Sequence, residues 1–555
     1  MKKLTIIGGG PAGYAAALYA SNFDLETTLI ESDTLGGTCL NRGCIPAKYW
    51  LHVAELNHEI ETSSEFGIDV NEKSINWAKT AEKRYEIINK LVGGIGMLLN
   101  SKKVNVIEGW GSIKDKNNVL VKKADGEEIV IESDTLGGTC LNRGCIPAKY
   151  WLHVAELNHE IETSSEFGID VNEKSINWAK TAEKRYEIVN KLVGGIGMLL
   201  NSKKVNVIEG WGSIKDKNNV LVKKADGEEI VIESDFILLA TGSKPRSLPS
   251  IEIDNEFTIT SDTALNWEKP PKKVCVIGAG AIGCEFASLL NDLDSDVVVV
   301  ELASEILPGL DKRTSGELRK QLSKRGVNFK LGTSVESITD KKVSFSDGES
   351  DNFDCVLVAV GREPLTQNIG LEEVGIKVNK GFVQTNLETL QTEIENIYAL
   401  GDIVEGTPQL AHVAFAEAVS SITHIATGEN KAVNYNAIPY VVYTRPELAE
   451  VGVNSEKAKE LGMKINQSQH GFAGIGRAMI QNQNQGLVKV YSEENGPIVG
   501  ASVCGPAAGE MIHELMYMVG WEALPDEASE FIHAHPTLSE AIGESLMSLS
   551  GRGLH

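Results

Sequence analysis

Cys39 and Cys44 are separated by four residues in the stretch GGTCLNRGCIPAKYW, Gly36–Trp50, and this spacing suits redox chemistry. A glycine-flanked turn leads here into an apparent helix, where a thiolate is stabilised by unpaired N–H groups and the helix dipole. In a cytosolic protein such a pair is more often catalytic than structural. Zinc is the alternative, but one copy of the stretch offers no second pair at ligand spacing, so we expect no metal.

The stretch is part of a long internal repeat. Ile30–Asp134 returns as Ile131–Asp235 at an offset of 101 residues, with one difference, Ile88 against Val189. Structural repeats of solenoids are shorter and diverge, whereas here even surface lysines and turn residues are identical. A recent tandem duplication or an assembly error explains this best, and removing one copy leaves a continuous chain of 454 residues.

Two glycine turns predict nucleotide binding. The first, GxGxxG at Gly8, Gly10 and Gly13, follows an apolar strand and precedes an alanine-rich helix, and a second strand then ends on Glu31. The unit recurs with Gly278, Gly280 and Gly283, followed by a strand ending on Glu301. Such turns bring backbone N–H groups to a pyrophosphate, and the acid accepts ribose hydroxyls. Since a carboxylate repels a 2′-phosphate, Glu301 favours NAD over NADP.

The repeat raises the question of one redox site or two. Each copy carries a cysteine pair, the second at Cys140 and Cys145, but neither copy contains a dinucleotide turn. The apolar faces of one copy need the rest of a nucleotide-binding domain for burial, so only one copy can dock. We expect one site per subunit, at Cys39 and Cys44 because they follow Glu31 directly, with Cys140 and Cys145 as the fallback.

Composition excludes several classes of partner. The net charge of −24 repels phosphate backbones and anionic lipids, so we expect no nucleic-acid partner. No apolar run approaches the roughly 18–20 residues of a membrane helix. The N-terminus passes straight into a strand, which predicts a cytoplasmic protein without a signal peptide. The four other cysteines lie in apolar surroundings and are expected to be packed thiols: Cys275, Cys284, Cys355 and Cys504.

The stretch GGTCLNRGCIPAK resembles the redox-disulfide signature of the class I pyridine nucleotide-disulfide oxidoreductases, in particular of members that act on dihydrolipoamide. The resemblance covers essentially the whole chain once one copy is removed. It implies an α/β fold with two Rossmann-like domains, for FAD and NAD, and an α+β C-terminal dimerisation domain. It also implies that Cys44 faces the flavin, that Cys39 exchanges with substrate, and that Lys48 lies beside the flavin and pairs with Glu285.

Further site residues are implied by the same resemblance, through the segments ATGS, IYALGD, QLAH and VGREP. The implied FAD contacts are Gly8, Gly10, Gly13, Glu31, Lys48, Thr241, Gly242, Ser243, Asp402, Gln409, Leu410, Ala411 and His412. The implied NAD contacts are Gly278, Gly280, Ile282, Gly283, Glu285, Glu301 and Gly361. The implied domains are 1–246 and 366–435 for FAD, 247–365 for NAD and 436–555 for dimerisation.

The C-terminal motif FIHAHPTLSE resembles the acid-base motif of the family. His535 would be the base and Glu540 its orienting partner, since an imidazole titrates near neutral pH and a bonded carboxylate fixes its tautomer. We expect His533 to be structural. The resemblance implies a homodimer in which His535 acts on the neighbouring subunit's disulfide.

The activity implied is oxidation of protein-bound dihydrolipoamide by NAD+, with a lipoylated acyltransferase or a glycine-cleavage carrier protein as partner. Two alternatives stay open: another NAD(P)H-dependent flavin disulfide reductase, and a non-functional or scaffold flavoprotein disrupted by the duplication.

Overall fold

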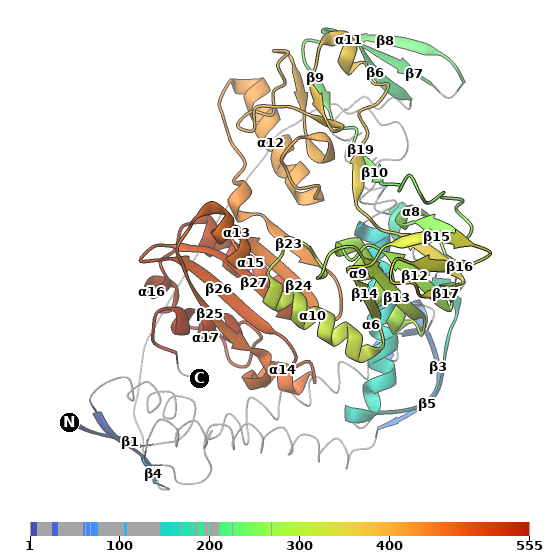
Figure 1. Ribbon diagram of the computed structural model, residues 1–555. Coiled ribbons are helices and arrows are strands. Elements are labelled where there is room, and N and C mark those ends of the chain that lie inside the picture. The colour runs from blue at the N-terminus through green and yellow to red at the C-terminus, as the bar shows by residue number, and fades with distance from the viewer. Residues whose placement is uncertain are drawn as a thin grey trace.

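The computed structural model (Figure 1) describes residues 2–7, 25–30, 59–60, 63–66, 68–75, 105–107, 145–167 and 169–178, scattered positions between 180 and 202, and 210–553 except 225 and 268. Within these residues the chain forms two nucleotide-binding parts of parallel strands and a C-terminal antiparallel sheet. The α/β class predicted from the sequence is confirmed.

The middle of the chain is a five-stranded parallel sheet that carries the second glycine turn. Its order is β11 (Thr258–Thr260), β18 (Cys355–Val358), β12 (Lys273–Ile277), β13 (Asp296–Glu301) and β14 (Asn328–Leu331). The central strands are rich in valine and buried on both faces, as parallel strands between helices are. Helices α9 (Ala281–Asp292) and α10 (Lys312–Arg325) connect successive strands, and a hairpin sheet of β15 (Val335–Thr339), β16 (Lys342–Phe345) and β17 (Ser350–Asn352) follows.

The strands of the first nucleotide-binding part lie in two separate parallel sheets. One has the order β1 (Lys2–Ile7), β2 (Leu25–Ile30), β4 (Asn105–Ile107), and the other pairs β22 (Ile397–Ala399) with β9 (Ile237–Leu239). If the two sheets are joined in the order β4, β2, β1, β22 and β9, their strands correspond in order to β14, β13, β12, β18 and β11 of the middle sheet. Figure 1 places β1 and β4 on the far side of the C-terminal sheet from β9.

A meander of strands, a helix and a pair of short strands belong with β9 and β22. A meander of β6 (Trp211–Asp216), β7 (Asn219–Lys223) and β8 (Glu229–Glu233) precedes β9, and helix α12 (Ala411–Thr427) follows β22. Short strands β10 (Ser243–Pro245) and β19 (Arg362–Pro364) pair antiparallel and join this part to the middle sheet.

The C-terminal part is an antiparallel sheet with helices on it. The order is β23 (Pro439–Val442), β24 (Glu447–Gly452), β27 (Ile498–Gly505), β26 (Leu487–Glu493) and β25 (Ile465–Gly471). Helix α15 (Ala508–Gly520) packs on β24 and β27, and α17 (Glu540–Leu549) packs on β25 and β26. Shorter helices are α8 (Ser261–Ala264), α11 (Leu371–Val374), α13 (Ser455–Leu461), α14 (Gly476–Ile480) and α16 (Pro525–Ala528).

The second copy of the repeat is built into the core of the molecule. It forms helix α6 (Cys145–Thr163), the 3-10 turn η2 (Ser164–Phe167) and strand β5 (Ile169–Ile176). Helix α6 packs on α9, where Trp151 is buried in the same cluster as Phe286 and Leu289. From the first copy, the turn η1 (Ser63–Phe66), strand β3 (Ile68–Ile75) and strand β4 are described. Strand β3 pairs antiparallel with β5, and β4 pairs parallel with β2.

The four cysteines predicted to be packed thiols, Cys275, Cys284, Cys355 and Cys504, are buried and free, as predicted. Burial raises the pKa of the Cys275 and Cys355 thiols to about 12 and raises the pKa of the Cys284 and Cys504 thiols further, which disfavours the thiolate form of all four. None of the helices in the described ranges has the length and apolarity to cross a bilayer.

Candidate active site

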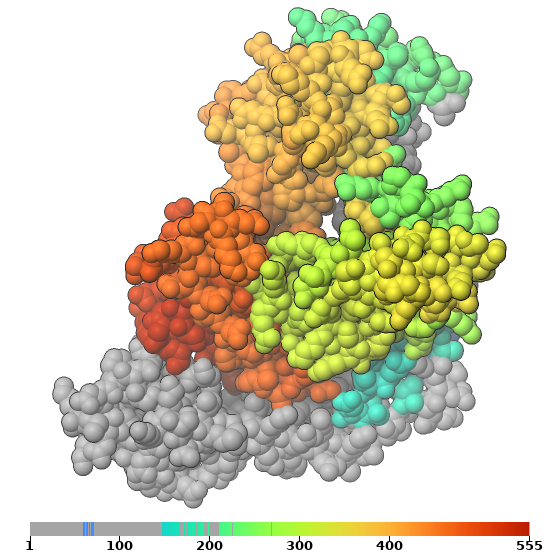
Figure 2. Space-filling view, viewed as in Figure 1, coloured from blue at the N-terminus to red at the C-terminus, as the bar shows by residue number. Residues whose placement is uncertain are grey.

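A large cavity brings together most of those predicted site residues that the structure describes. Its volume is about 2560 Å³, well above the roughly 300–1,000 Å³ of ordinary ligand pockets. Figure 2 shows the surface hollowed where the part carrying α12 meets the part carrying the middle sheet. Of the predicted residues, the cavity is lined by Thr241, Gly242, Ser243, Gly280, Ile282, Glu285, Gly361, Asp402, Gln409, Leu410, Ala411 and His412.

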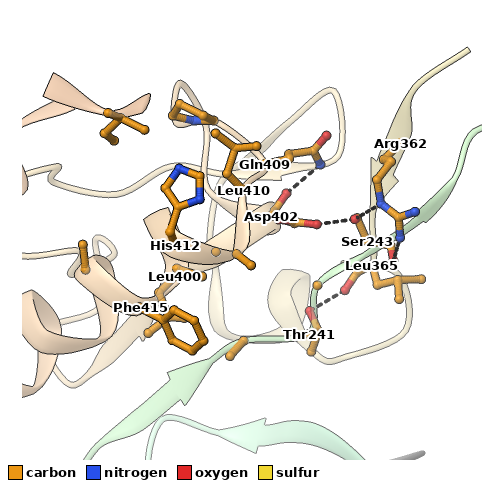
Figure 3. Close-up of a pocket in the computed structure, with 18 of the residues that line it drawn as sticks. Thr241, Ser243, Arg362, Leu365, Leu400, Asp402, Gln409, Leu410, His412 and Phe415 are labelled. Carbon is orange, nitrogen blue, oxygen red and sulfur yellow. Dashed lines mark hydrogen bonds between the residues drawn. The ribbon is translucent and has the colours of Figure 1, made fainter. Parts of the chain in front are cut away.

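One wall is fixed by hydrogen bonds between segments far apart in sequence (Figure 3). Ser243 Oγ donates to the carboxylate of Asp402, while Arg362 Nε donates to Ser243 Oγ at 2.7 Å. Gln409 Nε2 donates to the Asp402 carbonyl at 3.0 Å, and Thr241 Oγ1 donates to Leu365 O at 2.6 Å. The ATGS, GREP and QLAH segments are therefore held as one unit around the Asp402 carboxylate.

A buried carboxylate that the sequence analysis missed supports this wall. Glu417 on α12 is fully buried, accepts the Gly401 amide proton at 2.6 Å and accepts from the Tyr435 hydroxyl at 3.0 Å. Burial raises the pKa of Glu417. Gly401 has a φ of 73°, which favours glycine, so the bond fixes the turn that presents Asp402.

The glycine turn before α9 has the shape of an anion-binding site. Gly278 has a φ of 102°, and a Cβ there would lie 2.5 Å from Ala359 O. A Cβ on Gly283 would lie 1.9 Å from Gly278 O, so only glycine fits. Helix α9 begins with Gly280 as its N-cap and no side-chain cap, which leaves its N-terminus open to a phosphate.

Glu301, at the end of β13, is held beside this turn. Its Oε2 accepts the Ala279 amide proton at 2.7 Å and its Oε1 accepts that of Ala303 at 2.8 Å. Each carboxylate oxygen keeps a further lone pair for a ribose hydroxyl. The residues around the turn thus fit a dinucleotide without a 2′-phosphate.

An ion pair joins α6 to α9 inside the cavity. Lys149 Nζ donates to both carboxylate oxygens of Glu285, at 3.0 and 2.9 Å, and Glu285 also accepts the Tyr443 amide proton at 3.0 Å. The Lys149 side chain is 33% exposed and the Glu285 side chain 12%. Lys149 Nζ lies 4.3 Å from the centre of the Tyr443 ring. Burial, together with the Glu285 charge, raises the pKa of the nearby Tyr440 to about 12.

This pair corrects one expectation from the sequence. Lys48 was expected to pair with Glu285, but the lysine on Glu285 is Lys149, its counterpart in the second copy. The physical reason is that α6 of the second copy is the helix that packs on α9. Cys145 is the first residue of α6, one helical turn before Lys149. The remaining residues expected here lie outside the described residues: Gly8, Gly10, Gly13, Glu31, Cys39, Cys44, Lys48 and Cys140.

The histidine motif forms a separate cluster in the C-terminal part. His535 Nδ1 donates to Glu540 Oε1 at 2.7 Å, and Glu540 Oε2 accepts the Thr537 amide proton at 3.0 Å. Because a carboxylate only accepts, Nδ1 carries the proton and Nε2 presents its lone pair, as a base must. Neither His535 nor Glu540 is among the described residues that line the cavity.

His533 lies in a different environment from His535. Its Nε2 donates to Glu514 Oε1 at 2.5 Å, and this hydrogen bond raises the pKa of His533. A Cβ on Gly543 of α17 would lie 2.7 Å from the His533 ring. These contacts agree with the structural role expected for His533.

Models of known protein families match both the N-terminal and the C-terminal parts of the chain. The family model described as pyridine nucleotide-disulphide oxidoreductase matches residues 2–136 and, separately, residues 120–418. The model of the dimerisation domain of that family matches residues 438–546.

Curated relatives share the name dihydrolipoyl dehydrogenase. The chain is 35% identical over 444 residues to that of Bacillus subtilis, covering 77% of this chain and 93% of the relative. It is 39% identical over 433 residues to dihydrolipoyl dehydrogenase 3 of Pseudomonas putida, covering 76% and 92%. The mitochondrial enzyme of Canis lupus familiaris is 39% identical over 441 residues, covering 76% and 85%.

Solved structures agree on the fold. LpdA from Mycobacterium tuberculosis has a TM-score of 0.69 at 22% identity, covering 99% of this chain and all of that one. The flavoprotein disulfide reductase RclA from Escherichia coli has a TM-score of 0.66 at 26% identity, covering 75% and 93%.

Proposed function

Because this chain belongs to the pyridine nucleotide-disulphide oxidoreductase family, we propose that it oxidises protein-bound dihydrolipoyl groups to lipoyl groups, with FAD as resident cofactor and NAD+ as the final acceptor. The observation that carries the proposal is the shared cavity. Its lining includes the Thr241–Ser243 and Asp402 wall, the start of α9, and Lys149 one turn beyond Cys145. Residues expected at the flavin and at the nicotinamide nucleotide therefore share one cavity with the helix that begins at Cys145, which supports the proposal.

The described residues fit the NAD dinucleotide and one side of a flavin. Gly278, Gly283 and the open N-terminus of α9 would hold the NAD pyrophosphate, and Glu301 its ribose. Asp402 and the QLAH segment would hold the flavin side, in a cavity large enough for more than one ligand. In sequence, the expected first glycine turn stands between β1 and β2, which have the parallel pairing of β12 with β13. This sheet lies apart from the β22–β9 pair that carries the Asp402 wall.

We propose Cys140 and Cys145 as the working disulfide, one pair per subunit, in place of the expected Cys39 and Cys44. The sequence preference is not tested directly, because Cys39, Cys44 and Cys140 lie outside the described residues. The support comes from the position of helix α6. Helix α6 begins at Cys145 and is fixed on α9 by the Lys149–Glu285 pair and by buried Trp151.

The proposed reaction begins with proton transfer. His535 Nε2 takes the proton of a dihydrolipoyl thiol, and Glu540 stabilises the imidazolium through Nδ1. The substrate thiolate attacks Cys140 Sγ, which breaks the Cys140–Cys145 bond and leaves Cys145 as a thiolate. The second substrate thiol then attacks the mixed disulfide and releases the oxidised lipoyl group and the Cys140 thiol. FAD, held by Asp402 and the QLAH segment, would supply the redox chemistry that moves the electron pair of the cysteines on to NAD+ as the Cys140–Cys145 bond re-forms.

We propose that His535 acts on the disulfide of the other subunit of a homodimer. The support is that the base does not line the cavity of its own chain within the described residues. The match to the dimerisation domain supports dimer formation for the family. Large apolar side chains lie exposed beside both regions, including Trp521 at 77% at the cavity edge and Ile532 at 98% beside the histidine motif.

Several finer assignments complete the proposal. The substrate carrier is a lipoylated acyltransferase or a glycine-cleavage carrier protein, and the location is cytoplasmic. The repeat is a tandem duplication that adds bulk to the subunit without a second site. The domain limits are those inferred from the sequence.

The activity is tested with the purified full chain. We expect a flavin absorption spectrum and reduction of NAD+ with free dihydrolipoamide, with little reduction of NADP+ because of Glu301. A flavin-containing protein without turnover would favour a scaffold role. Turnover with other disulfides at a higher rate than with lipoamide would favour a different reductase of the family.

A further inference from the structure

The two copies of the repeat contact each other through the same strand. Strands β3 and β5 both have the sequence IDVNEKSI and run antiparallel. Ile68 faces Ile176 and Ile75 faces Ile169, so the two ends of the ladder are equivalent. In the middle the register shifts on both sides of Glu72, which is paired with Glu173, its own counterpart in the other copy.

This register has the form of a local two-fold axis. Each pair on one side of Glu72 and Glu173 has a reversed equivalent on the other: Val70 faces Lys174, and Lys73 faces Val171. In a symmetric dimer, two identical chains contact each other in this way, each through the same surface, about a two-fold axis. The strand IDVNEKSI is therefore complementary to itself.

Buried contacts hold the first copy in this position. Ile68 is fully buried, and the hydroxyl of Ser63, also buried, donates to Ile60 O at 2.8 Å and to Ile68 O at 2.9 Å. The Phe66 ring meets the His153 ring edge-on, with centroids 4.9 Å apart. Thr181 Oγ1 donates to Phe66 O at 2.8 Å. The pairing is thus part of a packed interface and not an isolated ladder.

Strand β5 depends on β3 for its pairing. In the part of the chain that the structure describes, the two form a sheet of two strands, so removal of β3 leaves both edges of β5 open. An open edge of eight residues is a ready template for another chain. The strand shown to fit that edge, in this register, is its own sequence.

We propose that strand β3, from the first copy of the repeat, covers the edge of β5 within one protein molecule. In the absence of β3, strand β5 of another molecule of this protein would pair with that edge. When β3 opens, β5 strands of two chains pair about the same two-fold axis. The repeat thereby controls association of the protein through this edge, separately from the C-terminal dimerisation domain.

The repeat supplies a matched pair of variants for the test. In the full-length chain, Val70→Pro breaks β3 and leaves β5 competent, whereas Val171→Pro makes the same change in β5 itself. We expect the first variant to self-associate about tenfold or more tightly than the unmodified chain in sedimentation velocity. We expect the second to show no such gain, because the strand that would pair has been disrupted.

A cross-linking measurement locates the contact. With Glu173→Cys added, oxidation should join two Val70→Pro chains through residue 173, and the Val70→Pro chain without the added cysteine should stay unlinked. Equal association of both proline variants, including equal aggregation, would overturn the proposal. So would a tighter Val70→Pro assembly without the 173 cross-link, or equal cross-linking when β3 is intact.

Discussion

The ion pair between Lys149 and Glu285 gives a direct test of which copy of the repeat is docked. Replacing Lys149 with methionine removes both hydrogen bonds to Glu285 and leaves a carboxylate that is 12% exposed with the Tyr443 amide as its remaining described partner. Hydrogen bonds to charged groups contribute about 1.5–3 kcal/mol, and the part-exposed lysine allows water to replace some of this. We expect a local loss of about 1–2 kcal/mol at the contact of α6 with α9.

The assay is amide hydrogen exchange of α9, followed by mass spectrometry. Peptides from α6 are unsuitable because the first copy yields identical ones, whereas the α9 sequence occurs once. A loss of about 1–2 kcal/mol speeds exchange of the α9 amides about 5–30-fold where they open locally. The matched control is Lys48→Met, the same change at the same place in the other copy, for which we expect exchange of α9 to be unchanged.

The reverse result would refute the reasoning. If Lys48→Met speeds α9 exchange and Lys149→Met does not, the first copy carries the contact and the disulfide returns to Cys39 and Cys44. Equal small effects of both variants would show that neither lysine is held by Glu285 in solution.

Three further predictions use the same chain. Cys145→Ser should abolish NAD+ reduction with dihydrolipoamide while flavin content stays normal, and Cys44→Ser should retain turnover; the opposite pattern in steady-state kinetics would contradict the proposed pair. Gly283→Ala places a Cβ 1.9 Å from Gly278 O. The resulting strain of about 1–3 kcal/mol should weaken NADH binding, measured by calorimetry, about 5–150-fold. An unchanged affinity would show that the turn does not contact the cofactor. Glu514 raises the pKa of His533. This pair therefore stabilises the fold below the ordinary histidine pKa of about 6.5, and the contribution is lost as pH rises through the higher pKa of the folded state. Glu514→Gln should lower the pKa of His533 in an NMR titration, and an unchanged pKa would show that Glu514 does not cause the shift.

The second glycine turn and the histidine motif were predictable because their chemistry is local. Gly278 and Gly283 lie where no Cβ fits, and His535 is bonded to Glu540 only five residues away. Spacing along the chain was enough to identify these groups. The fold class followed from the same strand, turn and helix pattern.

The choice between the two copies could not be predicted because it depends on distant contacts. Lys48 and Lys149 have identical neighbours in sequence, and only Glu285, on another helix, distinguishes them. Glu417 was missed for a similar reason, since its partners are the Gly401 amide and the Tyr435 hydroxyl. The pairing of β3 with β5 likewise joins segments about a hundred residues apart, which no local pattern indicates.

Asp311 ties the NAD-binding part to the C-terminal sheet. It caps α10 by accepting from the Arg313 and Thr314 amides. Its other oxygen accepts from Lys489 Nζ at 3.0 Å and from the Tyr491 hydroxyl, and both of these side chains are buried. Separating such a buried charge from its partner costs about 3–5 kcal/mol. A hinge motion that separated the two parts would leave this charge without its partners, so the Asp311 contacts oppose such a motion.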